Sequence, residues 1–402
     1  MDTVQIRINS KEKFKVMPWA RLVPEFSYRE FRDLSQAERL RRKDKKIPYL
    51  RHFKLHPEAT HGLMVPRVEI YESADNDIGV VQYEMTIYVS SLPKLLFENS
   101  LCEITPSNKE KIFDTIAERL HSAGIQVSPL TIATAPVPVV HFCKNIILPN
   151  ALSFRRLLAE LSHIDIGKAY DTRDDARVKD KNNGQVLHFY SGSREWSFYD
   201  KIDDMRRPKN KSEDKTKTEY EKELVELYGL QNTEVFRYEY RLKTTQTIKS
   251  ELNAILNRPY QTPVIFDDLF SAGLWKSVIL RSWKRVTNRP ENQLALLSIN
   301  SKLDLLVHIL KNAQKKDKNG HSQNQALWSY GLATAIKDHG AKAVRKELGK
   351  VWSNKSDERL DEKMAIAAKL AEGIAFSEEV LHINRELERF EFINLALLKK
   401  DV

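Results

Sequence analysis

The chain has 402 residues, of which 41% are hydrophobic and 30% are charged, and its formal net charge at pH 7 is +10. This length allows two or three domains, whereas the absence of an apolar run near eighteen residues excludes a membrane-spanning helix. The N-terminus also lacks the apolar segment of a signal peptide, so we expect a cytoplasmic protein without a membrane partner, whose charge suits a polyanion.

The first 60 residues predict a short strand and a basic helix. The strand runs from Val4 to Ile8, and the basic run from Arg39 to Lys46 ends before Pro48. Proline favours a helix end at this point. A solvated helix face and a surface for DNA phosphates are both consistent with the basic run.

Residues 61–260 alternate strands and helices, as a mixed α/β or α+β domain does. Period-two alternation in VPRVEIYES and VVQYEMTIYVS, with Asn, Asp and Gly between them, predicts a hairpin. Apolar residues at Ile112, Ile116 and Leu120 predict a helix that Gly124 ends. The prolines before HFCKN favour an edge or bent strand, and SFRRLLAELSHI predicts an amphipathic helix. We expect a mixed sheet with flanking helices.

Residues 261–402 predict an all-α domain with a possible helix-turn-helix. Two short helices meet at Asp338–Gly340, and Lys342 and Arg345 project from the second one. A Gly-containing turn followed by basic residues is compatible with DNA reading. An ordinary helical hairpin in a bundle has the same pattern.

The segment from Gly184 to Leu242 contains the residues best suited to chemistry. It places Tyr190 and Tyr199 on strand-like segments, and Lys201 follows two residues after Tyr199. A phenol with a pKa of about 10 is protonated at neutral pH, so a tyrosine nucleophile requires a nearby base or cation. Lys201 can supply that charge or bind a phosphate. The alternative is a tyrosine packed at a domain edge.

The strand EVFRYEYRL alternates charged and aromatic residues. Arg237, Glu239 and Arg241 share one face, and the aromatic residues share the other. Glu239 either pairs with the two arginines as a structural ladder or binds a divalent cation, Mg²⁺ or Mn²⁺, while an arginine binds a phosphate.

Two histidines lie in apolar strands, His141 in VVHFCKN and His188 in VLHFYSG. Each is either a core histidine or a metal ligand, and period two places His188 on the same face as Tyr190. Other chemistry loses sequence support, because the P-loop, dinucleotide-binding, zinc-protease and serine-hydrolase motifs are absent. Cys102 and Cys143 predict buried thiols, since two cysteines make no disulfide framework or zinc spacing.

Taken together, these segments resemble the replication initiators of rolling-circle plasmids and filamentous phages. The shared order is a strand followed by SLPKLLFENSL, a helix that ends in glycine before another strand, the block GQVLHFYSGSREWSFYDK, and FRYEYRL. It covers about residues 80 to 285. The resemblance lies in the order of four segments, because none of them is specific alone.

The resemblance implies a Rep-like catalytic domain whose tyrosine attacks one DNA strand and becomes linked to its 5′ phosphate, with a divalent metal assisting. Carried onto this chain, Tyr199 is the nucleophile, Lys201 the adjacent cation, Glu239 a metal ligand and Tyr190 the reserve nucleophile. The His-hydrophobic-His motif is absent, so His141 and His188 would have to meet from separate strands. The DNA-binding residues would be Arg194, Arg237 and Arg241, together with Lys342 and Arg345.

We therefore expect a DNA-nicking and strand-joining initiator with an N-terminal segment at 1–60, a catalytic domain at 61–260 and a helical domain at 261–402. Its partners would be origin DNA, single-stranded or cruciform, with host replication proteins and a second copy of the chain as further possibilities. One rival is a non-catalytic repressor or copy-control protein that uses the helical hairpin. Another is an RNA-binding or structural protein whose strand tyrosines stack on bases.

Overall fold

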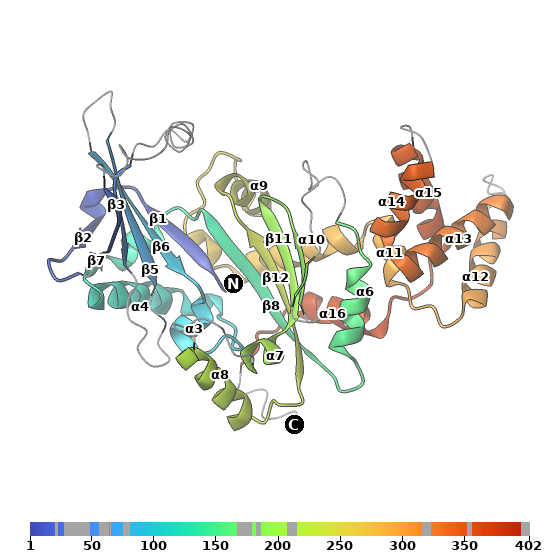
Figure 1. The fold of residues 1–402 in the computed structure, drawn as a ribbon, viewed down its shortest axis with the longest axis horizontal. Helices are drawn as coiled ribbons and strands as arrows, with labels where there is room; N and C mark the ends of the chain where they lie inside the picture. The colour runs from blue at the N-terminus through green and yellow to red at the C-terminus, as the bar shows by residue number, and fades with distance from the viewer. Residues whose placement is uncertain are drawn as a thin grey trace.

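The computed structural model describes residues 1–20, 23–27, 49–55, 64, 66–74, 81–166, 179–181, 186–206, 215–315, 323–351 and 356–394. A large twisted sheet with helices packed against it spans the left and centre of the view, and a group of helices extends from one end (Figure 1). The predicted α/β fold class with a helical C-terminal region is confirmed. Among the helices in these ranges, none is long and apolar enough to cross a membrane. The basic run at residues 39–46 lies outside the described ranges.

The sheet has ten strands, and the N-terminal strand lies in its middle. Across the sheet the order is β3 (Val23–Ser27), β4 (Tyr49–Leu55), β5 (Arg67–Ala74), β6 (Val81–Val89), β1 (Val4–Ile8), β8 (Val139–Leu148), β12 (Glu234–Leu242), β11 (Arg194–Asp200), β10 (Val186–Tyr190) and β9 (Lys179–Lys181). Every pair within it is antiparallel, where a mixed sheet was expected. The predicted first strand is confirmed, and it belongs to the same sheet as residues 61–260.

β8 is a central strand, so the expectation of an edge or bent strand is wrong. The prolines all precede its paired residues: Pro129 begins helix α5 (Pro129–Ala133), and Pro136 forms only an isolated bridge. From Val139 onward the strand has every backbone N–H, and it pairs with β1 on one side and β12 on the other. Proline disfavours a central strand only where a ladder hydrogen bond is needed.

The two faces of the sheet differ in chemistry, as the alternation in β12 predicts. On the aromatic face Phe198 stacks on Tyr238 with ring centroids 5.3 Å apart, and Trp283 from α10 (Ala272–Thr287) packs edge-on against Tyr238 at 5.7 Å. All three side chains are buried. The polar face holds Arg237 and Glu239.

Helices cover the aromatic face and form one core with it. These helices are α4 (Lys109–Ser122), α6 (Phe154–Ser162), α9 (Thr245–Ile255), α10 and α16 (Glu378–Arg389). The predicted helix before Gly124 is α4, and Gly124 ends it with a φ of 91°. Because α16 packs here, the C-terminal end of the described chain returns to the sheet (Figure 1).

The remaining C-terminal helices form a second core of their own. They are α11 (Pro290–Leu296), α12 (Lys302–Lys315), α13 (Gln323–His339), α14 (Ala341–Val351) and α15 (Ser356–Leu370). The predicted hairpin is α13–α14, and Gly340 lies between them with a φ of 82°. A side chain at Gly340 would meet the His163 backbone at 3.2 Å, and Ala341 donates its N–H to the His163 carbonyl. The turn is therefore packed against the end of α6.

Candidate active site

The polar face brings together five of the predicted site residues in three rows of cross-strand neighbours. Directly opposite residues of antiparallel strands point to the same face and have neighbouring Cβ atoms. From β11 through β12 to β8, the rows are Tyr199–Arg237–Asn145, Ser197–Glu239–Cys143 and Glu195–Arg241–His141.

Tyr199 and Glu239 are in direct contact at the centre of these rows. The Tyr199 hydroxyl donates to Glu239 Oε1 over 2.6 Å, and Arg237 Nε donates to the same oxygen over 2.7 Å. Arg241 donates to Glu239 Oε2 through Nε at 2.9 Å and Nη2 at 2.5 Å. The ladder of Glu239 with both arginines is thus present, and the tyrosine joins it.

Burial and charge fix the protonation states of this pair. Burial raises the pKa of Tyr199 well above 10, although the Arg237 charge opposes the shift. Burial alone would also raise the pKa of Glu239, but the two guanidinium groups and the tyrosine hydrogen bond outweigh it and hold that pKa well below its usual range. The resting pair is therefore a neutral phenol that donates to an ionised carboxylate.

Arg237 is buried, so the prediction that it contacts DNA is wrong. It is 1% exposed, and its guanidinium also bonds Asp2 Oδ2 at 2.8 Å, the Ser100 carbonyl at 3.1 Å and Asn145 Oδ1 at 3.2 Å. These partners fill the space around the guanidinium. Arg237 therefore orients Glu239 instead of meeting a phosphate.

Arg241 is the more accessible arginine of the pair. Its side chain is 24% exposed, and its Nη1 bonds Glu195 Oε1 at 2.7 Å. Glu195 also pairs with Lys243 Nζ at 2.5 Å and His188 Nδ1 at 3.3 Å. Burial would raise the pKa of Glu195, but the His188 hydrogen bond and these cations lower it to about 2. Lys243 was not among the predicted site residues, although period two continues from Arg241 to it.

Of the other two candidates for chemistry, Lys201 lies beside Tyr199 and Tyr190 lies two rows away from it. Lys201 begins α7 (Lys201–Arg206), is 5% exposed, and its Nζ lies 5.7 Å from the Tyr199 ring centre and 2.9 Å from Asp204. Tyr190 lies opposite Glu195, and Lys243 Nζ is 5.9 Å from its ring centre. The 2.6 Å contact with a buried carboxylate distinguishes Tyr199 as the nucleophile candidate.

Three predicted DNA-binding residues lie away from this site. Arg194 bonds Glu251 of α9 at 2.9 Å, and Arg345 of α14 pairs with Glu291 at 3.3 Å and Asp361 at 2.5 Å. Both arginines pair with carboxylates of the fold, and their contact with DNA stays a prediction. Lys342 is exposed on α14.

The predicted metal ligands do not form a metal site. Both carboxylate oxygens of Glu239 already accept from guanidinium groups, and a divalent cation there would face two positive charges. Burial and the Arg241 charge lower the pKa of His141 to about 4, and His188 bonds Glu195. Within the described ranges, no group of three or more His, Cys, Asp or Glu side chains is arranged to bind a metal. The donor set therefore does not fit the implied cation.

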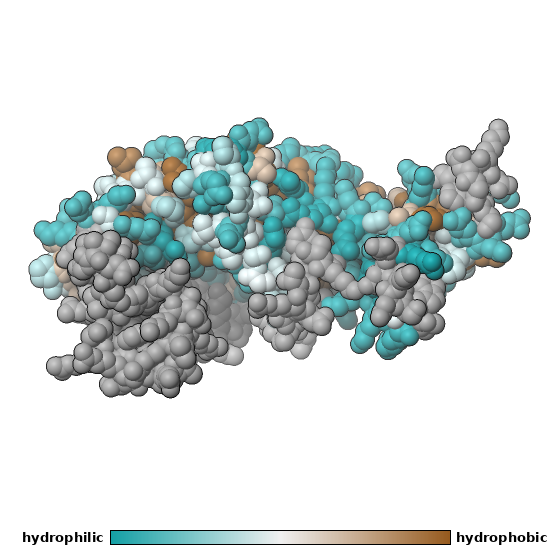
Figure 2. All heavy atoms as spheres, turned by 90° about the horizontal axis from the view of Figure 1, so that it is seen from above, coloured by the Kyte–Doolittle hydropathy of each residue, from teal (hydrophilic) through white to brown (hydrophobic). Residues whose placement is uncertain are grey.

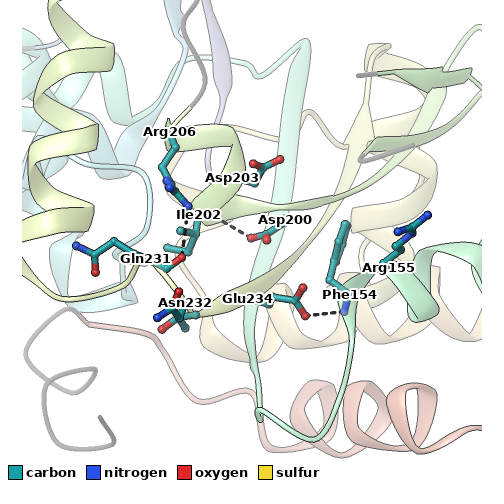
Figure 3. Close-up of a pocket in the computed structure, with 10 residues that line it drawn as sticks. Phe154, Arg155, Asp200, Ile202, Asp203, Arg206, Gln231, Asn232 and Glu234 are labelled. Carbon is teal, nitrogen blue, oxygen red and sulfur yellow. Dashed lines mark hydrogen bonds between the residues drawn. The ribbon is translucent and has the colours of Figure 1, made fainter. Parts of the chain in front are cut away.

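A polar pocket of about 550 Å³ lies where β11 ends, one residue beyond Tyr199 (Figure 3). Asp200 and Glu234 point into it, with Arg155 and Arg206 at its sides. Asp200 Oδ1 accepts the Ile202 N–H at 3.0 Å, and Glu234 accepts the N–H that begins α6 at 2.8 Å. Both carboxylates therefore support element ends as well as lining the pocket.

Asp200 should make stability depend on pH. Burial raises its pKa to about 6, above the usual value near 4. The folded state then binds this proton more tightly than the unfolded chain, so the contribution is present below about pH 4 and lost as the pH rises through about 6. Asp200→Asn keeps the Oδ1 acceptor, and we expect it to stabilise the protein at pH 8 by on the order of 1–2 kcal/mol.

Urea unfolding at pH 5, 6, 7 and 8 measures this effect. Asp304→Asn, at an exposed position in α12, is the matched control. Parallel pH curves for wild type and Asp200→Asn would contradict the assignment.

Comparison with known proteins gives no relative for this arrangement: no protein-family model matches the chain, and neither the curated proteins nor the solved structures contain a match.

Proposed function

We propose that this protein nicks and rejoins one DNA strand at a replication origin, with Tyr199 as the nucleophile. The observation that carries the proposal is the 2.6 Å hydrogen bond from Tyr199 to the buried, ionised Glu239. A phenol beside a carboxylate is the arrangement that nucleophilic attack by tyrosine requires. The net charge of +10 suits a nucleic-acid partner, and the described part of the face in Figure 2 is mainly hydrophilic.

In the proposed reaction the Tyr199 oxygen attacks phosphorus and its proton passes to Glu239. The bond from phosphorus to the 3′ oxygen breaks, and that oxygen takes a proton from water. The hydroxide left behind takes the proton from Glu239, which returns to its ionised form. The products are a 5′ phosphotyrosine link and a free 3′ hydroxyl, which host polymerases can extend in the cytoplasm. Rejoining is the reverse transfer.

Arg241 provides a way to activate Glu239 only when substrate is bound. Because the Arg241 side chain is partly exposed, it can turn toward a phosphate of the DNA. That phosphate then competes with Glu239 for the guanidinium. Glu239 would then lose one of its two cationic partners, and its pKa would rise toward the usual range. Glu239 thereby becomes a stronger base as the scissile phosphate arrives.

The test compares Tyr199→Phe with Tyr190→Phe, a matched change on the same face. Each protein is incubated with a supercoiled plasmid that carries the DNA flanking the coding sequence, in Mg²⁺, Mn²⁺ or EDTA. We expect nicked circles and a covalent adduct from wild type and Tyr190→Phe, and a loss of at least roughly 10³-fold in Tyr199→Phe.

The outcomes separate the possible failures. An adduct that survives in Tyr199→Phe but not in Tyr190→Phe would move the nucleophile to Tyr190. No nick and no adduct from wild type in any of the three buffers would overturn the proposed activity. The EDTA arm shows whether other donors recruit a metal, since the predicted ligands do not.

A further inference from the structure

The ten-stranded sheet consists of two five-strand units with the same order. One unit runs β3-β4-β5-β6-β1 and the other β9-β10-β11-β12-β8. In each unit the strand that comes first in the sequence, β1 or β8, lies innermost in the sheet. The strand that comes last, β6 or β12, lies beside it, and the remaining strands run in sequence order from the outer edge inward. Each last strand leads to a capped helix: Ser91 accepts the Lys94 N–H, and Thr244 accepts the Thr247 N–H.

The register shows that a twofold rotation relates the two units. Val4 of β1 pairs with Val140 of β8, and both are fully buried on the core face. Val4 also pairs with Val89, and Val140 with Leu242, in the last strand of the respective unit. An axis through the Val4–Val140 pair, normal to the sheet, therefore exchanges β6 with β12.

This rotation places Tyr71 where the other unit has Tyr199. Glu84 lies five residues before Val89 in β6, and Arg237 lies five residues before Leu242 in β12. Glu84 lies opposite Tyr71 of β5, and Arg237 lies opposite Tyr199 of β11. Both tyrosines thus occupy the same position on the same polar face.

Tyr71 also has the same chemical partner as Tyr199. Its hydroxyl donates to Glu69 Oε2 over 2.5 Å, and the Tyr88 hydroxyl donates to that oxygen over 3.1 Å. Arg67 Nη2 lies 3.5 Å from Glu69 Oε1. Glu69 is 7% exposed, whereas Tyr71 is partly exposed and the Arg67 side chain is 47% exposed.

The carboxylate of each centre is ionised but comes from a different strand. Burial alone would raise the pKa of Glu69, but the two tyrosine hydrogen bonds and nearby cations lower it. Glu69 precedes Tyr71 on the same strand and lies opposite Thr86, whereas Glu239 lies across from Ser197 on the neighbouring strand. The tyrosine–glutamate pair recurs although the carboxylates are not equivalent positions.

We propose that Tyr71 and Glu69 form a second strand-transfer centre that joins the 5′ phosphate of a second DNA strand. The inference rests on the proposed function of Tyr199, and the reaction balances in the same way. The Tyr71 oxygen bonds to phosphorus, its proton passes to Glu69, and the departing 3′ oxygen takes a proton from water. The hydroxide left behind then takes the proton from Glu69.

The two centres are too far apart to act on one phosphodiester. They are five strand spacings apart across the sheet, and each lies five residues from the axis in opposite directions. With ~4.8 Å between strands and ~3.4 Å per residue, a flat sheet would separate them by about 40 Å. Each centre therefore takes its own strand, and the axis between them matches the symmetry of an inverted repeat.

Adduct mapping tests the second centre. Wild type, Tyr199→Phe, Tyr71→Phe, the double variant and Tyr260→Phe are incubated with heat-denatured plasmid carrying the DNA that flanks the coding sequence. Denatured DNA offers Tyr71 single strands without a prior nick at Tyr199, which a supercoiled plasmid does not. After nuclease and protease digestion, mass spectrometry locates nucleotide-bearing tyrosines. We expect modification at both Tyr71 and Tyr199 in wild type, at Tyr71 alone in Tyr199→Phe, at Tyr199 alone in Tyr71→Phe, and at neither in the double variant.

Tyr260→Phe is the matched control, because this tyrosine is 48% exposed outside both centres and its change should keep both adducts. Thermal unfolding confirms that each variant is folded. If Tyr199 is modified but Tyr71 is not modified in any protein that retains it, the second centre alone is overturned. Modification of Tyr71 but not Tyr199 in wild type supports the second centre and overturns the assignment of Tyr199, whereas an unmodified wild type overturns both.

Discussion

The Arg237→Ala substitution is expected to lower the free energy of unfolding by about 3–5 kcal/mol, because it leaves buried carboxylates without their cation. Arg237 is 1% exposed and bonds Asp2 and Glu239 as well as the Ser100 carbonyl. The Glu239 carboxylate would still pair with Arg241. The Asp2 carboxylate would lose its cation and keep the hydrogen bond from the Ser91 hydroxyl. Urea unfolding at pH 7 measures the loss.

Arg389→Ala is the matched control for this experiment. Its guanidinium is 64% exposed and pairs with Glu386 three residues earlier in α16 at 3.1 Å. Such exposed pairs contribute about 0–1 kcal/mol. If Arg237→Ala were no more destabilising than Arg389→Ala, the guanidinium would not organise the site, and the role of Arg237 in orienting Glu239 would be wrong.

Arg345→Ala is expected to destabilise the helical C-terminal core by about 3 kcal/mol and to leave DNA affinity per folded molecule unchanged. The Arg345 side chain is 13% exposed and links α14 to Glu291 of α11 and Asp361 of α15. Its Nε also lies 3.6 Å from Asp165. Removing it leaves carboxylates from three segments without this cation. Urea unfolding and fluorescence anisotropy with labelled DNA measure the two effects.

Lys346→Ala is the neighbouring control, since its side chain is exposed on the same helix. It should change stability by less than about 0.5 kcal/mol. The comparison also addresses the rival function, in which the α13–α14 hairpin reads DNA without catalysis. A large loss of DNA affinity in Lys346→Ala and Lys342→Ala, with Tyr199→Phe unaffected, would favour that regulator.

Local patterns were sufficient to predict the core of the site. Period two in EVFRYEYRL placed Glu239 on a polar face and the aromatic residues on a buried one, and both faces are present. The strand-like segment before Lys201 is β11, which pairs with β12 and places Tyr199 beside Glu239. Alternation has this power because the side-chain period of a strand is fixed at two residues.

The surroundings of the arginines could not be predicted in the same way. Three arginines look alike in the sequence but have different surroundings. Arg194 pairs with Glu251, Arg237 is buried against Asp2, and Arg241 is partly exposed. Asp2 is 235 residues from Arg237, so nothing in the local pattern reports it. Such partners depend on the order of strands in the sheet, which no local period encodes.

The twofold relation was also invisible in the sequence. Along the two polar faces Tyr71 matches Tyr199, but Glu84 stands where the other unit has Arg237, and Glu69 where it has Ser197. The core needs only apolar side chains of suitable volume, so it places weak limits on residue identity. The backbone register therefore shows a twofold relation that the side chains do not.

The resemblance to rolling-circle initiators remains a hypothesis about activity. Its expected nucleophile and carboxylate are 2.6 Å apart, but the metal ligands that it implies are not assembled. The missing metal ligands distinguish the two alternatives for Glu239, a partner of the arginines or a ligand of a divalent cation. The carboxylate is saturated by arginines and tyrosine, so it acts as an orienting base in the proposed function and not as a ligand.

The position of β1 between β6 and β8 also constrains how a nascent chain can acquire this structure. Val4 has neighbours 85 and 136 residues later, at Val89 and Val140. The first strand must therefore wait, unpaired on its inner edge, until the ribosome has released the start of the second unit. Contacts of such long sequence separation slow folding and leave strand edges open to aggregation. We expect β1 to complete the sheet late, so that both tyrosine centres assemble only after the two halves have joined.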